Sequence, residues 1–188
     1  MAYDSIVNRY LGTLGFDADR SRLAIGGVEV AFHCDKFNTR ILKNIEDVMG
    51  YEDGGKLLRE WAEKTTHDAL AKFFKGDSEF TALAPRERVE AILELFKVLA
   101  YGAVSVKSFG DSGAVFSSPY SYLAEGWLEN KKAWGWTLRQ GPACHDMCGH
   151  LAAAMSIAFG KPIGAFTAVE TSCRTMDAPE CVFEIKGA

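Results

Sequence analysis

The sequence predicts a single α+β domain in which an antiparallel sheet is covered by helices. Hydrophobic residues recur at helical spacing over several stretches, and glycine-containing turns join pairs of short segments with strand-like patterns. No Pro- or Ser-rich linker, repeat or low-complexity tract divides the 188 residues. This length suits one domain, alone or with a helical extension, and a hydrophobic content of 48% is enough for a sizeable core.

Charge and composition narrow the class of function. The formal net charge is -4 and the basic residues are scattered among acidic ones, so we expect no nucleic-acid partner. The chain begins without the basic and apolar regions of a signal peptide, and no stretch has the roughly 18 uncharged apolar residues of a membrane span. We therefore expect a cytoplasmic protein with no membrane partner. Its five cysteines should be reduced there, which favours metal binding or redox chemistry over disulfides.

The first third of the chain predicts a helix and a hairpin. Residues 3–14 have the spacing of a short helix, and residues 23–32 form a hairpin around Gly26-Gly27, a two-residue turn signal. We interpret His33 and Cys34, which follow the hairpin, as packed or surface residues.

Three helices follow, and each has an apolar stripe. The first covers 37–49 and should end at Gly50, the second covers 55–75, and the third runs from Pro85 to Gly102. The stripe of the first comprises Phe37, Ile41, Leu42, Ile45, Val48 and Met49. The stripe of the second comprises Leu58, Trp61, Ala62, Thr65, Ala69 and Phe73.

The rest of the chain predicts a second hairpin, two helices and two strands. In order, these are the hairpin 103–109 and 114–117, a short helix over 120–130, an Ala-rich helix over 144–160, and strands over 163–170 and 181–185.

Four of the five cysteines lie in the last quarter of the chain. Cys144 and Cys148 are four residues apart on the predicted helix, so they share a face. Cys173 and Cys181 bracket a seven-residue loop, with Glu170 just before it at the end of a strand. Thiolate, imidazole and carboxylate groups are the ligand types that bind Zn²⁺, so the sequence predicts a zinc site here.

The spacing leaves the ligand set open. One version combines Cys173 and Cys181 with one helix cysteine and Glu170, and a second uses both helix cysteines and leaves Glu170 outside the coordination. His145 or His150 could replace a thiolate in either version. Four protein ligands would make the metal structural, whereas an open position would admit water or substrate.

These residues resemble the closing pattern of the four-vinyl-reductase type domain, which occurs in a bacteriochlorophyll biosynthesis protein and in sensors of aromatic-responsive transcription activators. The pattern is a cysteine that leads a Gly-containing helix, then Glu, two residues and Cys, then a loop and a Cys with an apolar residue close behind. Its counterparts here are Cys144, Gly149, Gly160, Glu170, Cys173, Cys181 and Phe183. Residues 28–50 and 100–119 are similar to the family's opening strand and helix and its central hairpin. The loop 174–180 departs from the pattern because it lacks a glycine.

The resemblance implies a twisted antiparallel sheet flanked by helices, related to a vesicle-tethering subunit and to haem-based gas sensors. It implies zinc bound by Cys144, Glu170, Cys173 and Cys181. Cys148 is the alternative first ligand, because the interval before Glu170 is longer than in the sensors. The domain would cover 21–188 with an N-terminal helical extension over 1–20, and would act as a free-standing homodimer.

The implied partner is a small hydrophobic molecule, of aromatic, hydrocarbon or tetrapyrrole-like character, held in an apolar pocket. Seven aromatic residues are candidates for its walls, although such residues more often fill a core. They are Phe96, Tyr101, Phe116, Tyr122, Trp127, Trp134 and Trp136. The leading hypothesis is a zinc-containing binding protein, a sensor or carrier. The alternative is an enzyme of tetrapyrrole or aromatic metabolism in which His145, Asp146 and His150 or the metal do chemistry, although no nucleotide, nicotinamide or flavin motif is visible.

Overall fold

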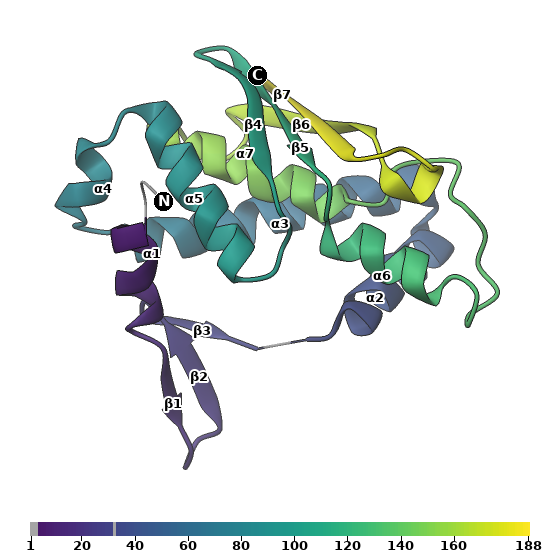
Figure 1. The fold of residues 1–188 in the computed structure, drawn as a ribbon, viewed down its shortest axis with the longest axis horizontal. Coiled ribbons are helices and arrows are strands. Elements are labelled where there is room, and N and C mark those ends of the chain that lie inside the picture. The colour runs from purple at the N-terminus through teal and green to yellow at the C-terminus, as the bar shows by residue number, and fades with distance from the viewer. Residues whose placement is uncertain (1–3, 32) are drawn as a thin grey trace.

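A four-stranded antiparallel sheet packs on a buried helix in the computed structural model, which describes residues 4–31 and 33–188 (Figure 1). The strand order is β4-β5-β7-β6. The strands are β4 (Ser105–Gly110), β5 (Gly113–Ser118), β6 (Phe166–Ser172) and β7 (Cys181–Gly187). The predicted α+β class is confirmed, and the hairpin β4-β5 and the two C-terminal strands form one sheet.

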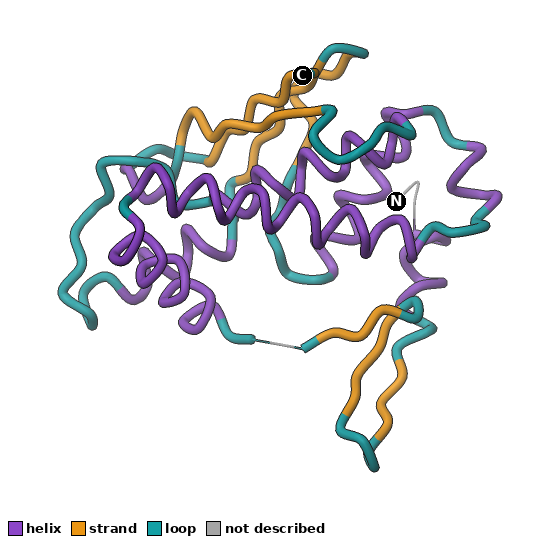
Figure 2. Tube along the Cα trace, turned by 180° about the vertical axis from the view of Figure 1, so that it is seen from behind, coloured by secondary structure: helices purple, strands orange, loops and turns teal. Residues whose placement is uncertain are grey.

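Helix α7 (His145–Phe159) lies between this sheet and a long helix, α3 (Tyr51–Phe73) (Figure 1). Both sides of α7 are therefore covered, which explains why nearly all its residues are buried and why small alanines suit it. Gly149 marks the crossing of the two helices. A Cβ atom there would lie 2.6 Å from the backbone nitrogen of Glu63, so only glycine allows this approach. Seen from behind, α3 crosses the middle of the molecule, with most of the sheet above it in this view (Figure 2).

The other helices surround this central pair. Helix α2 (Asp35–Met49) and helix α6 (Tyr122–Asn130) lie side by side at one end (Figure 1). At the other end lie α1 (Asp4–Leu11), α4 (Ser78–Ala82) and α5 (Pro85–Val98), and a 3-10 turn η1 (Arg174–Met176) joins the C-terminal strands. Among the described residues, no helix is long and apolar enough to cross a membrane.

The N-terminal hairpin forms a small sheet of its own, of β1 (Gly15–Asp17), β2 (Arg22–Ile25) and β3 (Val28–Val30), which extends away from the body (Figure 1). The sequence predicted two strands here; the third, β1, is short and exposed and has no alternating pattern to reveal it. Phe32, the predicted end of this hairpin, lies outside the described residues.

Several predicted boundaries and faces were wrong. Helix α3 begins at Tyr51 rather than 55, and α5 ends at Val98, with Ala100 rather than Gly102 in the left-handed conformation at its end. Strand β6 begins at Phe166 instead of 163. Five stripe residues are exposed, because α2 and α3 contact the body over narrower faces than their apolar patterns suggest: Phe37 (47%), Val48 (85%), Met49 (43%), Trp61 (56%) and Thr65.

Candidate metal centre and adjoining cavity

Four buried side chains converge where α7 meets the ends of β6 and β7. Ligand atoms of Cys144, Glu170, Cys173 and Cys181 all lie within 4.8 Å of one another. The Sγ atom of Cys181 is 3.8 Å from Sγ of Cys144 and 3.9 Å from Sγ of Cys173. A tetrahedral zinc with Zn–S bonds of about 2.3 Å would separate two sulfurs by about 3.8 Å. The three thiols and the carboxylate therefore could hold a metal ion, and their spacing fits zinc.

The local structure explains how these side chains meet. Glu170 follows Phe166 and Ala168 on the inward row of β6, and a bulge after Glu170 ends the regular pairing with β7. Cys181 begins β7 and also points inward. Cys144 immediately precedes α7, and its backbone N–H donates to Oε2 of Glu170 over 2.8 Å.

The electrostatics of the cluster also suit a cation. Burial raises the pKa of Glu170 to about 9, and its Oε1 atom is buried without a hydrogen-bond partner. Hydrogen bonds from the Cys144 and Cys181 thiols lower the pKa of Cys173. An orphaned carboxylate oxygen next to a thiolate is costly unless a positive charge compensates it.

Two buried hydroxyl groups support the sulfur atoms from outside. The Oγ atom of Ser121 lies 3.1 Å from Sγ of Cys144, and Oγ1 of Thr175 lies 3.1 Å from Sγ of Cys173. Hydroxyl groups in these positions can donate to thiolates, so they help to fix two of the three sulfur atoms.

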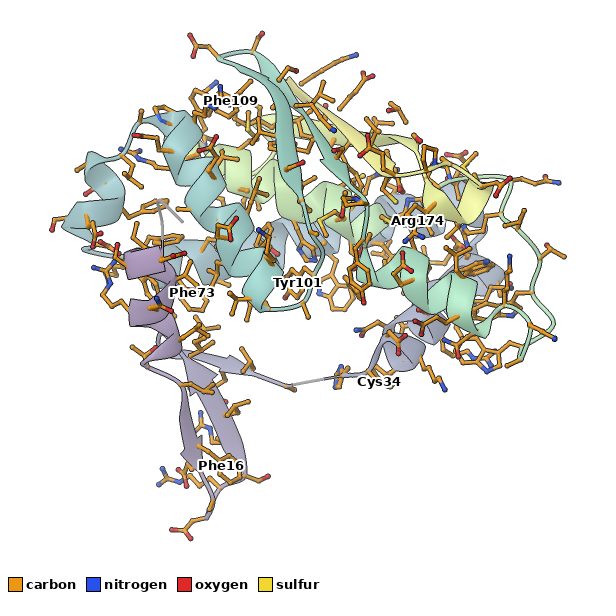
Figure 3. All side chains as sticks on the ribbon, viewed as in Figure 1. Phe16, Cys34, Phe73, Tyr101, Phe109 and Arg174 are labelled. Atoms are coloured by element: carbon orange, nitrogen blue, oxygen red, sulfur yellow. The ribbon has the colours of Figure 1, made fainter. Side chains whose placement is uncertain are left out.

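The alternative ligands lie apart from this group of atoms. Cys148 is buried on α7 in a separate 180 Å³ cavity that it shares with Arg59 and Glu63, and burial raises its pKa. The fifth cysteine, Cys34, is exposed next to the start of α2 (Figure 3).

His145, the first residue of α7, belongs to a buried ionic network with residues of α2 and α3. Its Nδ1 atom is 3.1 Å from Arg59, and its Nε2 atom is 3.4 Å from Oε1 of Glu46. Glu46 in turn forms a bidentate ion pair with Arg139, and both side chains are at least 90% buried. Burial alone would raise the pKa of Glu46, but hydrogen bonds from His145 and Arg139 lower it overall.

A cavity of about 540 Å³ adjoins α7, which contributes Asp146 and His150 to its wall. Its walls come from the segment after β3, α2, α3, the end of α5, the start of α6 and α7. The apolar lining residues are Val30, Ala31, Ile41, Leu42, Leu58, Trp61, Ala62, Val98, Leu99, Ala100 and Leu123. Trp61, Val98 and Tyr120 line the cavity and are 56, 42 and 50% exposed, so they lie at its rim. A cavity of this volume accommodates a ligand of one or two rings.

The inner wall of this cavity carries polar groups from α7. His150 is 8% exposed, stacks on Tyr101 and has Nδ1 2.6 Å from Oγ1 of Thr66. The hydroxyl group of Tyr122 donates to Asp146, the next polar residue on this face of α7. Burial raises the pKa of Tyr101 and of Tyr122, and the charge of Asp146 adds to both effects. Tyr101 lies in the loop after α5, near the centre of the molecule (Figure 3).

The structure separates the seven predicted pocket residues into three groups. Tyr101 and Tyr122 line the cavity. Phe96 packs behind Tyr101 and His150, and Phe116 is core on β5, paired with Phe183 of β7. The three tryptophans form a separate cluster. Trp136 stacks on Trp127 and contacts Trp134, with the Arg40 and Arg139 side chains over the rings.

Most cavity residues were missed by sequence reasoning. His33 lines the cavity, although the sequence suggested an ordinary surface or packed residue, and Trp61 had been assigned to the core stripe. One feature of the sequence could have indicated the cavity. The apolar stripes of α2 and α3 are wider than the faces that these helices bury, and apolar residues left exposed in this way often mark a binding site.

Comparison with known proteins shows that the fold recurs. No family profile and no curated protein matches the chain by sequence. Among solved structures, the phenol-responsive sensory domain of the transcription activator PoxR, in complex with phenol, has a TM-score of 0.77 at 15% identity. The alignment covers 97% of this chain and 89% of that one. The predicted likeness to such sensor domains is confirmed at the level of the fold.

Two further solved structures share the fold less closely. A vinyl-4-reductase family protein from Methanocaldococcus jannaschii has a TM-score of 0.50 at 16% identity, over 85% of this chain and 83% of that one. Trafficking protein particle complex subunit 3 from Naegleria fowleri, covalently bound to palmitic acid, has a TM-score of 0.51 at 10% identity. The alignment covers 82% of this chain and 95% of that one.

Proposed function

We propose that this protein binds a small, largely apolar molecule in the 540 Å³ cavity and that zinc at Cys144, Glu170, Cys173 and Cys181 stabilises the fold around it. Helix α7 connects the two sites. Its N-terminal end adjoins the cysteine cluster, and Asp146 and His150 on its first turns line the cavity.

The observation that carries this proposal is the composition of the cavity wall. Most of the wall is apolar, and its charged or imidazole groups lie at two places, Asp146 and His150 on α7 and His33 and Asp35 at the start of α2. This is the usual arrangement of a small-molecule site, in which apolar surface supplies affinity and a few polar groups fix orientation. The likeness to a phenol-binding sensory domain supports a sensor or carrier role.

Zinc, when bound, supplies a structural cross-link between α7, β6 and β7. Four protein ligands would fill the coordination sphere of the metal, so this role needs no open position for substrate. Cys144 is the first ligand in this proposal, because its sulfur belongs to the convergent group and that of Cys148 does not.

Isothermal titration with para-propylphenol tests the binding proposal. Thr65 is exposed at the cavity, so Thr65→Trp should fill the cavity without disturbing the core and abolish binding. Thr171, exposed on β6 and outside the cavity lining, provides the matched control Thr171→Trp, which should bind like the wild type. Binding that survives Thr65→Trp would place the ligand elsewhere.

The same titration separates a binding protein from the enzyme alternative. A binding protein returns para-propylphenol unchanged after prolonged incubation, whereas an enzyme acting through His150 would convert it or a related aromatic compound. His145 faces the ionic network rather than the cavity, so a comparison of His145→Gln with His150→Gln assigns any turnover. The homodimer and the division into 1–20 and 21–188 stay predictions from the family resemblance.

A further inference from the structure

The cavity wall has an unbalanced charge. Two carboxylates, Asp35 and Asp146, line it, and among the described lining residues none is lysine or arginine. A cavity that held an organic acid or a phosphate ester would need a basic group to compensate the negative charge of the ligand. The wall has the opposite composition.

Asp146 is the carboxylate on the inner wall, and its contacts leave its charge uncompensated. Its Oδ1 atom accepts from the backbone N–H of Met147 over 2.8 Å, and its Oδ2 atom accepts from the Tyr122 hydroxyl. Both donors are neutral, and none of the ion pairs among residues 4–31 and 33–188 includes Asp146. Each oxygen keeps a second lone pair for a further donor.

The neighbouring histidine does not supply the missing charge at neutral pH. Burial lowers the pKa of His150, and Asp146 only partly offsets this effect. The inner wall therefore presents a carboxylate beside a neutral imidazole.

Aromatic rings complete the surroundings of Asp146. Tyr101 and Tyr122 line the same part of the cavity with ring centroids 6.0 Å apart, and Tyr120 and Trp61 stand at the rim. Aromatic faces attract cations, and a carboxylate among them adds a direct partner for an ammonium group.

We infer that the cavity selects an organic amine, with the ammonium group on Asp146 and the apolar body against Leu42, Leu58 and Leu123. This inference rests on the proposed binding function and names its ligand class: an aryl-alkyl or alkyl amine that is a cation at neutral pH. Organic acids are excluded from the site by the charge of Asp146, and neutral analogues of the amine bind more weakly.

Three probes of nearly equal shape test this selectivity by isothermal titration at neutral pH. Tyramine carries an ammonium group, para-propylphenol replaces it by a methyl group, and para-hydroxyphenylpropanoate ends in a carboxylate. We expect tyramine to bind about tenfold more tightly than para-propylphenol, as one charge-assisted hydrogen bond allows, and the acid to show no binding. Equal or tighter binding of para-propylphenol would overturn the inference but leave the proposed function intact. Absence of binding by all three probes would count against both.

A variant assigns the selectivity to one side chain. Asp146→Asn keeps the shape of the side chain and an acceptor for the Tyr122 hydroxyl. The variant should therefore weaken the binding of tyramine about tenfold and change the binding of para-propylphenol much less. Asp68→Asn, at a side chain 70% exposed on α3, makes the same chemical change outside the cavity and should bind like the wild type. An unchanged preference for tyramine in Asp146→Asn would overturn the inference, and the wild-type ratio tests it even if this variant folds poorly.

Discussion

His150 lies nearly parallel to Tyr101, with ring centroids 4.7 Å apart and an angle of 17° between the planes. The stack joins α7 to the loop after α5, and Phe96 packs against both rings. The inner wall of the cavity is thus held by contacts between α7 and the end of α5 with its following loop, which are far apart in the sequence. The uncharged form of His150 is part of that arrangement.

Acidification should destabilise the protein through His150. Burial lowers the pKa of His150 below its usual 6.5, so the unfolded chain binds a proton more readily than the folded chain. The free energy of unfolding should therefore fall as the pH drops below about 6.5. Thermal unfolding between neutral and mildly acidic pH should show a shallower pH dependence for His150→Gln than for the wild type. Identical pH profiles would contradict a buried neutral His150.

Removal of a predicted zinc ligand should lower both metal content and stability. We expect Cys173→Ser and Cys181→Ser to lose zinc and to be destabilised by about 4 kcal/mol or more, because the loss of a structural metal is among the largest effects of single substitutions. That corresponds to roughly 8–16 °C in Tm for a chain of this size. Elemental analysis of chelator-washed protein, combined with thiol titration, measures the metal content.

Cys148→Ser is the matched control for these variants. Cys148 is buried on the same helix as the site but does not share its convergent group, so its variant should retain one zinc per chain. If Cys148→Ser loses zinc and Cys144→Ser keeps it, then Cys148 is the ligand and Cys144 is not.

Gly149→Ala should destabilise the protein even though alanine favours helices. Alanine gains about 1 kcal/mol over glycine in a helix interior, but the added Cβ atom would lie 2.8 Å from Cβ of Ala62 and collide with the backbone of α3. Overpacking of this kind costs about 1–3 kcal/mol, so a net loss in chemical denaturation is expected. The control is Gly110→Ala, because a Cβ atom at Gly110 would have its nearest neighbour at 3.9 Å and would cause no steric clash. A stabilised Gly149→Ala would show that α3 and α7 can separate without cost.

Arg139→Met should expose the dependence of the fold on the buried ion pair with Glu46. The side chains of Arg139 and Glu46 are 6% and 10% exposed, so removal of the arginine leaves a buried carboxylate without its main partner. The expected cost is about 3–5 kcal/mol. The double variant Arg139→Met with Glu46→Gln should recover part of that loss, and a double-mutant cycle with no coupling would contradict the role of this pair.

The sequence allowed the order of elements and the neighbourhood of the cysteines to be predicted, because both depend on local patterns. Glu170 and Cys181 point inward by strand alternation, and Cys144 lies at the start of a helix whose apolar residues are recognisable. The cavity depends on how α2, α3 and α7 cross, which no local pattern specifies. Trp61 therefore looked like a core residue. Likewise, no local pattern specifies that the candidate pocket residues Trp127, Trp134 and Trp136 pack on one another outside the cavity lining.

The most direct test of the central claim is to map where para-propylphenol binds, by backbone amide chemical-shift changes in the zinc-loaded protein. Saturable shifts should concentrate around Leu58, Tyr101 and His150, at the inner wall of the cavity. Shifts confined to the tryptophan cluster or to the N-terminal sheet, or no saturable shifts at all, would contradict binding in the cavity.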